Sequence, residues 1–178
     1  EEQLPANLCP LIKSTYGYHL NHANPFLEMA DLLVGETTCD GKKKMYELLA
    51  RDRDMYVLHL PQKADDERSS ELWLNELKAF AAFLERRYGV ELTTDRLREA
   101  IAFMNKERGL RRRLAELMKR DRPPLAGRRL LDLKTIVAGM PDVLTHLDGA
   151  YRALANGHGA GAPHAGVRVL LTGVPTVH

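Results

Sequence analysis

The sequence predicts a helix-rich α/β fold in which a small parallel sheet precedes a long helical region. Two short apolar runs, at 31–37 and 55–60, have the length and the flanking turn residues of buried strands. A helix-like segment at 40–51 separates them, and two strands joined through a helix form a parallel pair. After residue 65 the apolar residues recur every three or four positions, which is the period of a helix.

The composition is that of a soluble globular protein. With 178 residues the chain is long enough for one domain with a core, or for a small domain with an added helical part. Its formal charge of +2 is too small to steer the whole molecule towards nucleic acid or an anionic membrane surface. No apolar run approaches the roughly 18 residues of a membrane-spanning helix, and the first residues lack the features of a secretory signal. We therefore expect a cytoplasmic protein with neither membrane nor nucleic acid as a partner.

Cys9 and Cys39 are the two cysteines of the chain. They are too few and too far apart for a disulfide framework, and there is no Cys-x-x-Cys pair with the spacing of a zinc site. A helix is expected over 7–22, because Pro10 suits the first turn of a helix, where its missing N–H costs nothing. Cys9 then lies at a helix N-terminus. A cysteine alone in such a place is more often structural than a ligand.

Cys39 lies in the turn between the first strand and the helix expected over 40–51. Ligands gather at the carboxyl ends of parallel strands, and a helix N-terminus stabilises a thiolate through its unpaired N–H groups. Thr37 and Thr38 have hydroxyl groups that can donate hydrogen bonds to sulfur, and Gly41 lets the backbone come close. This pattern favours a metal ligand or a nucleophile. A half-buried structural cysteine beside a threonine-rich helix start explains the same residues, and local physics leaves both interpretations open.

Two neighbouring features are interpreted as structural. The second strand stops at Pro61, which places His59 near the same rim of the sheet, but a lone histidine on an apolar strand is more often a structural residue. The lysines at 42–44 lack the spaced glycines and the trailing Ser or Thr of a phosphate loop, so we reject nucleotide binding there. Successive helix residues point about 100° apart, so one lysine at most faces a site and the others are solvated.

The helical region extends over 65–156, and four helices are expected in it, at 65–88, 94–119, 130–137 and 143–154. Gly89 is a typical residue to end the first of them, and Thr94 is a typical cap for the second. We expect the two long helices to pack as an antiparallel pair.

A basic segment lies inside this region. Between Lys106 and Arg122 there are eight basic and three acidic residues, including Arg111, Arg112 and Arg113. Such a segment could hold the phosphates of a coenzyme or a nucleic acid backbone. We favour an exposed helix face with acidic partners nearby, because no aromatic residues are interleaved for base stacking.

The chain therefore divides into three parts. Residues 1–64 form a strand–helix–strand region and residues 65–156 a helical region. Residues 157–178 form a glycine-rich connector with the first strand of a following α/β domain. The last strand, at 167–171, ends in a Gly-x-Pro turn of the kind that begins a new α/β unit, and no strand precedes Cys9. We expect a chain that is truncated at both ends.

Three segments, at 8–17, 35–45 and 60–62, carry a resemblance to a known family. The string Thr-Thr-Cys-Asp-Gly-Lys-Lys-Lys within the second is highly specific, and weaker similarity extends to 168–175. On these residues the chain resembles the 2-hydroxyacyl-CoA dehydratase and benzoyl-CoA reductase family, which includes the double-cubane cluster proteins. The resemblance covers essentially the whole chain but only part of a family subunit.

The resemblance implies a Rossmann-like or flavodoxin-like parallel sheet flanked by helices, with a helical insertion. It also implies an iron–sulfur cluster, a [4Fe-4S] cluster or a double cubane, held by three cysteines per subunit. Cys9 and Cys39 would be the first two metal ligands, with Thr37, Thr38 and Gly41 beside the cofactor, so 1–64 would be the cluster-binding region. The third ligand would follow a strand like that at 167–171 and is absent here. A cluster with too few thiolates is labile, so we expect this chain alone to be inactive.

The implied activity is the transfer of low-potential electrons to an acyl-CoA thioester, for dehydration or ring reduction. The implied partners are a sister subunit or a second copy, an ATP-hydrolysing iron–sulfur activator, and the acyl-CoA substrate. Two alternatives stay open: a double-cubane cluster reductase of small molecules, and a metal-free assembly or binding module with the same fold.

Overall fold

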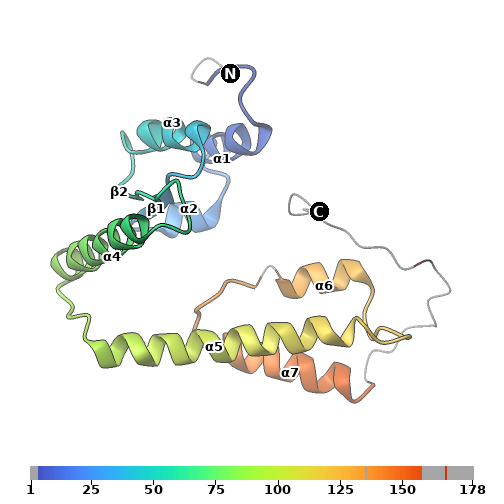
Figure 1. The fold of residues 1–178 in the computed structure, drawn as a ribbon. Helices are drawn as coiled ribbons and strands as arrows, with labels where there is room; N and C mark the ends of the chain where they lie inside the picture. The colour runs from blue at the N-terminus through green and yellow to red at the C-terminus, as the bar shows by residue number, and fades with distance from the viewer. Residues whose placement is uncertain (1–3, 135, 158–166, 168–178) are drawn as a thin grey trace. The chain divides into compact units, whose positions relative to one another are not determined.

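The computed structural model of the chain describes residues 4–134, 136–157 and 167 (Figure 1). The chain forms two compact units, Glu1–Leu92 and Thr93–His178. The connector and the strand expected at 157–178 lie outside the described residues, apart from Gly157 and Val167. In the described part of the chain, no helix combines the length and the apolar character needed to cross a membrane.

The first unit contains a two-stranded parallel sheet. Its strands are β1 (Leu33–Glu36) and β2 (Met55–Leu58), and α3 (Asp40–Leu49) connects them (Figure 1). The register pairs Leu33 with Met55 at one end and Glu36 with Leu58 at the other. The predicted strand–helix–strand arrangement is therefore confirmed, and with it a helix-rich chain of α/β character, although both strands are shorter than the apolar runs indicated.

The core of the first unit lies between α1 (Pro10–Leu20) and α3, which pack against each other. Pro10 occupies the first turn of α1, as expected. The buried residues of this core come mainly from one face of each helix: Leu4, Ile12, Tyr16, Met45, Leu48 and Leu49. Leu33 and Met55 extend the core onto the sheet. A short helix, α2 (Pro25–Met29), leads into β1. Asn24 is its N-cap, and the Asn24 side chain accepts hydrogen bonds from two backbone N–H groups.

The long helix α4 (Glu67–Tyr88) packs on β2 and belongs to the first unit. Tyr56 of the strand lies against two rings of the helix, with centroid separations of 4.7 Å to Phe80 and 4.8 Å to Phe83. Gly89 ends the helix with φ of 63°, a left-handed conformation that glycine adopts without strain. The first unit extends to Leu92, shortly after this helix.

The second unit is helical. It consists of α5 (Thr94–Leu117), α6 (Gly127–Lys134) and α7 (Val143–Ala155). Figure 1 shows α5 and α7 side by side and running in the same direction. Their shared core is made of fully or nearly fully buried residues: Leu114, Leu117, Val143, Leu147 and Leu154. Each long helix thus has its packing partner within its own unit, β2 for α4 and α7 for α5.

Candidate metal centre

Both cysteines occupy the same kind of position, the residue that precedes the first turn of a helix. Cys9 is the N-cap of α1, and Cys39 is the N-cap of α3. Neither side chain caps its helix with a hydrogen bond, although both backbone carbonyls accept from the first turn. Neither thiol is in a disulfide. The sulfur atoms are therefore not needed for capping and remain available to an external ligand.

The two thiols differ in burial. Cys9 is exposed, whereas Cys39 is half-buried and packs against the edge of the core between α1 and α3. Cys39 is thus in contact with apolar side chains on one side while part of its surface stays accessible. Such a position combines a fixed location with access for a ligand, and full burial, the signature of an inert cysteine, is not observed.

Gly41 explains how the starts of α1 and α3 come together. A Cβ atom on Gly41 would lie 2.7 Å from Cδ1 of Ile12 and 2.8 Å from Cδ1 of Leu8, both closer than carbon atoms normally approach, and 3.8 Å from Sγ of Cys39. The sequence led us to expect that Gly41 lets the backbone come close to a bound cluster, and this stays a prediction. In the structure, the first turn of α3 approaches the side chains at the start of α1, beside the sulfur of Cys39.

The turn that carries Cys39 is held by Glu36, the last residue of β1. Its carboxylate accepts a hydrogen bond from the backbone N–H of Thr38 at 2.8 Å and pairs with Nζ of Lys42 at 2.5 Å. Lys42, followed by the side-chain and backbone bonds of Thr38, lowers the pKa of Glu36 to about 2. The pKa of Lys42 is raised, mainly by its hydrogen bond to Glu36. The two residues therefore form an ion pair within the turn that leads to Cys39.

The two threonines fasten this turn to the sheet. The Thr37 hydroxyl accepts a hydrogen bond from the backbone N–H of Leu60 at 2.9 Å. The backbone N–H of Thr37 donates to the carbonyl of Leu58. The Thr38 side chain bonds the Glu36 carboxylate. These contacts join the end of β1 to the end of β2. Hydrogen bonds from either hydroxyl to sulfur stay a prediction.

The neighbouring charged residues have separate roles. Lys43 pairs with Asp40 at 3.0 Å, and Lys44 pairs with Glu47, both on the surface of α3. The three lysines therefore have different partners, and Lys42 reaches back to Glu36 at the end of β1. The ion pair of Glu36 and Lys42 was not predicted from the sequence. The sequence indicated it only by placing two opposite charges on either side of the strand-to-helix turn.

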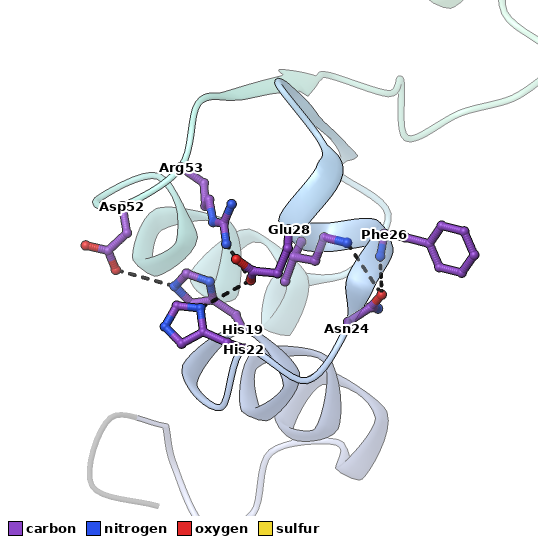
Figure 2. Close-up of polar contacts among 8 residues, drawn as sticks. His19, His22, Asn24, Phe26, Glu28, Asp52 and Arg53 are labelled. Carbon is purple, nitrogen blue, oxygen red and sulfur yellow. Dashed lines mark hydrogen bonds and ion pairs between the residues drawn. The ribbon is translucent and has the colours of Figure 1, made fainter.

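A polar cluster secures the other end of α1 (Figure 2). His19 is buried, and its Nε2 lies 3.4 Å from Oδ2 of Asp52 in the turn after α3. Glu28 of α2 accepts from Arg53 at 2.6 Å and lies 3.3 Å from Nδ1 of His22. This cluster joins α1, α2 and the turn after α3. It supports the position of α1 from the end opposite to Cys9.

The donor set fits part of an iron–sulfur centre. Thiolates are the ligands that such clusters prefer, and a four-iron cluster usually has four of them. The chain has two cysteines, and within the described residues no group of three or more histidine, cysteine or carboxylate side chains is arranged to hold a metal ion. Within the described residues, the two helix-start thiols could supply at most two thiolates of such a cluster.

Comparisons with known proteins give a consistent result. The family model of the 2-hydroxyglutaryl-CoA dehydratase D-component matches residues 1–178. The chain is also 44% identical, over 131 residues, to an Escherichia coli (strain K12) protein described as "Putative dehydratase subunit YjiM". That alignment covers 74% of the chain and 34% of the relative, so the chain spans about a third of the length of this curated relative.

Proposed function

The chain belongs to the 2-hydroxyglutaryl-CoA dehydratase D-component family, and from this premise we propose that it is the cluster-binding part of a dehydratase or reductase subunit. Cys9 and Cys39 would be two of the cluster ligands. The observation that carries the proposal is the placement of both thiols at the N-termini of two helices that pack against each other, free of capping bonds. Family membership supports the dehydratase assignment, and the geometry supports the ligand assignment.

The electrostatics around Cys39 suit a thiolate ligand. A helix N-terminus carries a partial positive charge that favours a thiolate, and the ion pair of Lys42 with Glu36 lies in the same turn. Gly41 lets the first turn of α3 pack closely against Leu8 and Ile12 beside the cysteine. Thr37 and Thr38 hold the turn rigid through the ends of both strands. Together these residues would keep the cysteine oriented and lower the cost of holding a negatively charged sulfur there.

A bound cluster would supply low-potential electrons to the carbonyl region of an acyl-CoA thioester. We propose that an ATP-hydrolysing iron–sulfur activator provides these electrons, and that a sister subunit or second copy completes the enzyme in the cytoplasm. We further propose that β1, α3 and β2 are the beginning of a larger Rossmann-like or flavodoxin-like sheet. The parallel pairing and the position of Cys39 just after the carboxyl end of β1 support this view.

Anaerobic reconstitution of the subunit with iron and sulfide tests the ligand assignment. We expect bound iron and sulfide with the broad visible absorption of a cubane, and loss of most of the bound iron in Cys39→Ser and in Cys9→Ser, because each removes a thiolate. Thr93→Ser is the matched control, since it changes the N-cap of α5 outside the site. Unchanged iron content in Cys39→Ser would refute the assignment. A subunit that takes up no iron at all would instead favour a metal-free assembly module.

A further inference from the structure

The turn that carries Cys39 is closed by a contact between the residues on its two sides. Glu36 ends β1 before the turn, and Lys42 lies in the first turn of α3 after it. Their side chains form an ion pair, with Nζ 2.5 Å from Oε1, so the chain makes a closed loop that contains Cys39. We call this contact the Lys42 strap. It ties the start of the helix to the end of the strand that precedes the cysteine.

The turn that carries Cys9 is closed in the same way. Lys13, in the first turn of α1, donates from Nζ to the backbone carbonyl of Ala6 at 2.9 Å, and this Lys13 strap again encloses the cysteine. The segment before Cys9 is itself folded back, because the backbone N–H of Leu8 donates to the carbonyl of Pro5 at 3.0 Å. Each N-cap cysteine therefore lies in a loop whose ends are joined by a lysine of the following helix.

The two straps differ in their acceptors. Glu36 also accepts a hydrogen bond from the backbone N–H of Thr38 at 2.8 Å, so one carboxylate holds the chain both before and after Cys39. Ala6 offers only a neutral carbonyl to Lys13. An ion pair adds the attraction of two opposite charges to the hydrogen bond, so we expect the Lys42 strap to be the stronger of the two.

The neighbouring ion pairs of α3 do not enclose a cysteine. Lys43 pairs with Asp40 at 3.0 Å, and Lys44 pairs with Glu47. Both partners of each pair lie within the helix, after Cys39. A lysine at this helix start is thus not a strap because of its charge alone. It is a strap when its partner lies on the other side of the cysteine.

We propose that Lys42 and Lys13 are positioning residues for the two thiols, and that each strap holds its cysteine in one orientation for the cluster. The inference rests on the proposed function, because it gives a role to residues beside the proposed ligands. Contacts around a metal ligand orient it, and their loss weakens metal binding. The cysteine side chains make no capping hydrogen bond that would fix them, so closure of the surrounding loop restricts their backbone instead.

Alkylation of the iron-free chain with iodoacetamide tests the straps without a cluster, and mass spectrometry of the peptides gives a separate rate for each cysteine. Limiting rates at alkaline pH are compared, because they describe the thiolate itself and report its accessibility. We expect Lys42→Gln to speed alkylation of the half-buried Cys39 about threefold, which is the effect of losing one partly exposed ion pair. Cys9 lies in another turn and should keep its rate.

Four further variants show whether the contact itself is responsible. Lys13→Gln is the matched variant in the other turn and should leave the rate at Cys39 unchanged. Glu36→Gln should act as Lys42→Gln does, because it removes the opposite charge of the same pair, and Lys42→Arg should retain the original rate by keeping the cation. Glu47→Gln is the control for an ion pair of α3 that is not a strap.

Release of iron to a chelator from the reconstituted chain is the second measurement, and we expect Lys42→Gln to release iron faster than Glu47→Gln does. The proposal is overturned if the two variants release iron equally fast or alkylate Cys39 equally fast. It is also overturned if Lys42→Gln speeds Cys9 as much as Cys39, since the whole unit would then be loosened. A chain that binds no iron would refute the proposed function and leave the alkylation result valid, so the two failures are distinguishable.

Discussion

Gly35 illustrates how a single residue sets the distance between sheet and helix. It lies in β1 beneath the ring of Tyr46 from α3, and a Cβ on Gly35 would lie 2.6 Å from two carbon atoms of that ring. An alanine must therefore displace a half-buried aromatic ring. We expect Gly35→Ala to lower the free energy of unfolding by about 1–3 kcal/mol, measured by urea denaturation.

Gly17 provides the contrasting case in the same unit. It lies inside α1, and a Cβ there would meet no atom within 4 Å. We expect Gly17→Ala to raise the free energy of unfolding by up to about 1 kcal/mol, because alanine favours the helix more than glycine does. Equal destabilisation by both substitutions would contradict the packing described at Gly35.

Glu36 makes the first unit sensitive to acid. Its pKa is lowered from 4.5 to about 2 by Lys42 and Thr38, so the folded state favours the ionised carboxylate. The resulting stabilisation is fully present above pH 4.5 and is lost as the pH falls through about 2, where the folded state also takes up the proton. We expect Glu36→Gln to be less stable than the unsubstituted chain at neutral pH and to approach it near pH 2, measured by denaturant unfolding across this range. If the difference in stability between Glu36→Gln and the unsubstituted chain did not change with pH, the Glu36–Lys42 ion pair would contribute nothing through its charge.

At the scale of elements, a buried carboxylate connects α5 to the segment that leads into α7. Glu107 is 1% exposed, and it accepts hydrogen bonds from Arg111 at 2.8 Å and from the backbone N–H of Gly139 at 3.0 Å. The Gly139 bond, followed by Arg111, keeps the pKa of Glu107 below its usual value. The network also holds the end of α6 and the segment after it, because Arg111 donates to the carbonyls of Leu133 and Ile136.

Glu107→Gln should therefore destabilise the second unit. The substitution leaves the Arg111 guanidinium without its carboxylate, and we expect a loss of about 2–4 kcal/mol in the free energy of unfolding. Glu116→Gln is the control on the same helix, since Glu116 pairs with Lys119 on the exposed surface, where such pairs contribute at most about 1 kcal/mol. Similar losses in the two variants, measured by circular dichroism during denaturation, would contradict this account.

At the scale of the whole molecule, the two units have separate cores. Leu49 is 3% exposed in the core of the first unit, and Leu147 is 0% exposed in that of the second. The single tryptophan, Trp73, lies in α4 and reports on the first unit alone. We expect Leu49→Ala to shift the unfolding transition seen by tryptophan fluorescence, because the cavity costs about 2–5 kcal/mol.

Leu147→Ala should leave that fluorescence transition in place and shift only the part of the circular dichroism signal that comes from the second unit. The physical reason is that a compact unit with its own core can unfold as a unit of its own. If Leu147→Ala moved the tryptophan transition as far as Leu49→Ala does, the two units would be a single cooperative structure.

Local sequence patterns determined the main elements and the position of both cysteines. The length of a strand, the period of a helix and the signals of Pro10 and Gly89 at helix ends are all features of short segments. The parallel strand pair and the helix starts at Cys9 and Cys39 could therefore be predicted without knowledge of distant contacts. The specific string around Cys39 also indicated the family that the comparisons then showed.

Tertiary structure alone decided which segments meet. The approach of Gly41 to Leu8, the packing of α4 on Tyr56, and the packing of α5 against α7 all depend on residues that are far apart in the sequence. Periodicity shows that a helix has an apolar face but does not identify the surface that covers it, because burial of apolar area has no direction. The same holds for charge: only the folded chain shows that Arg111 is engaged internally by the buried Glu107.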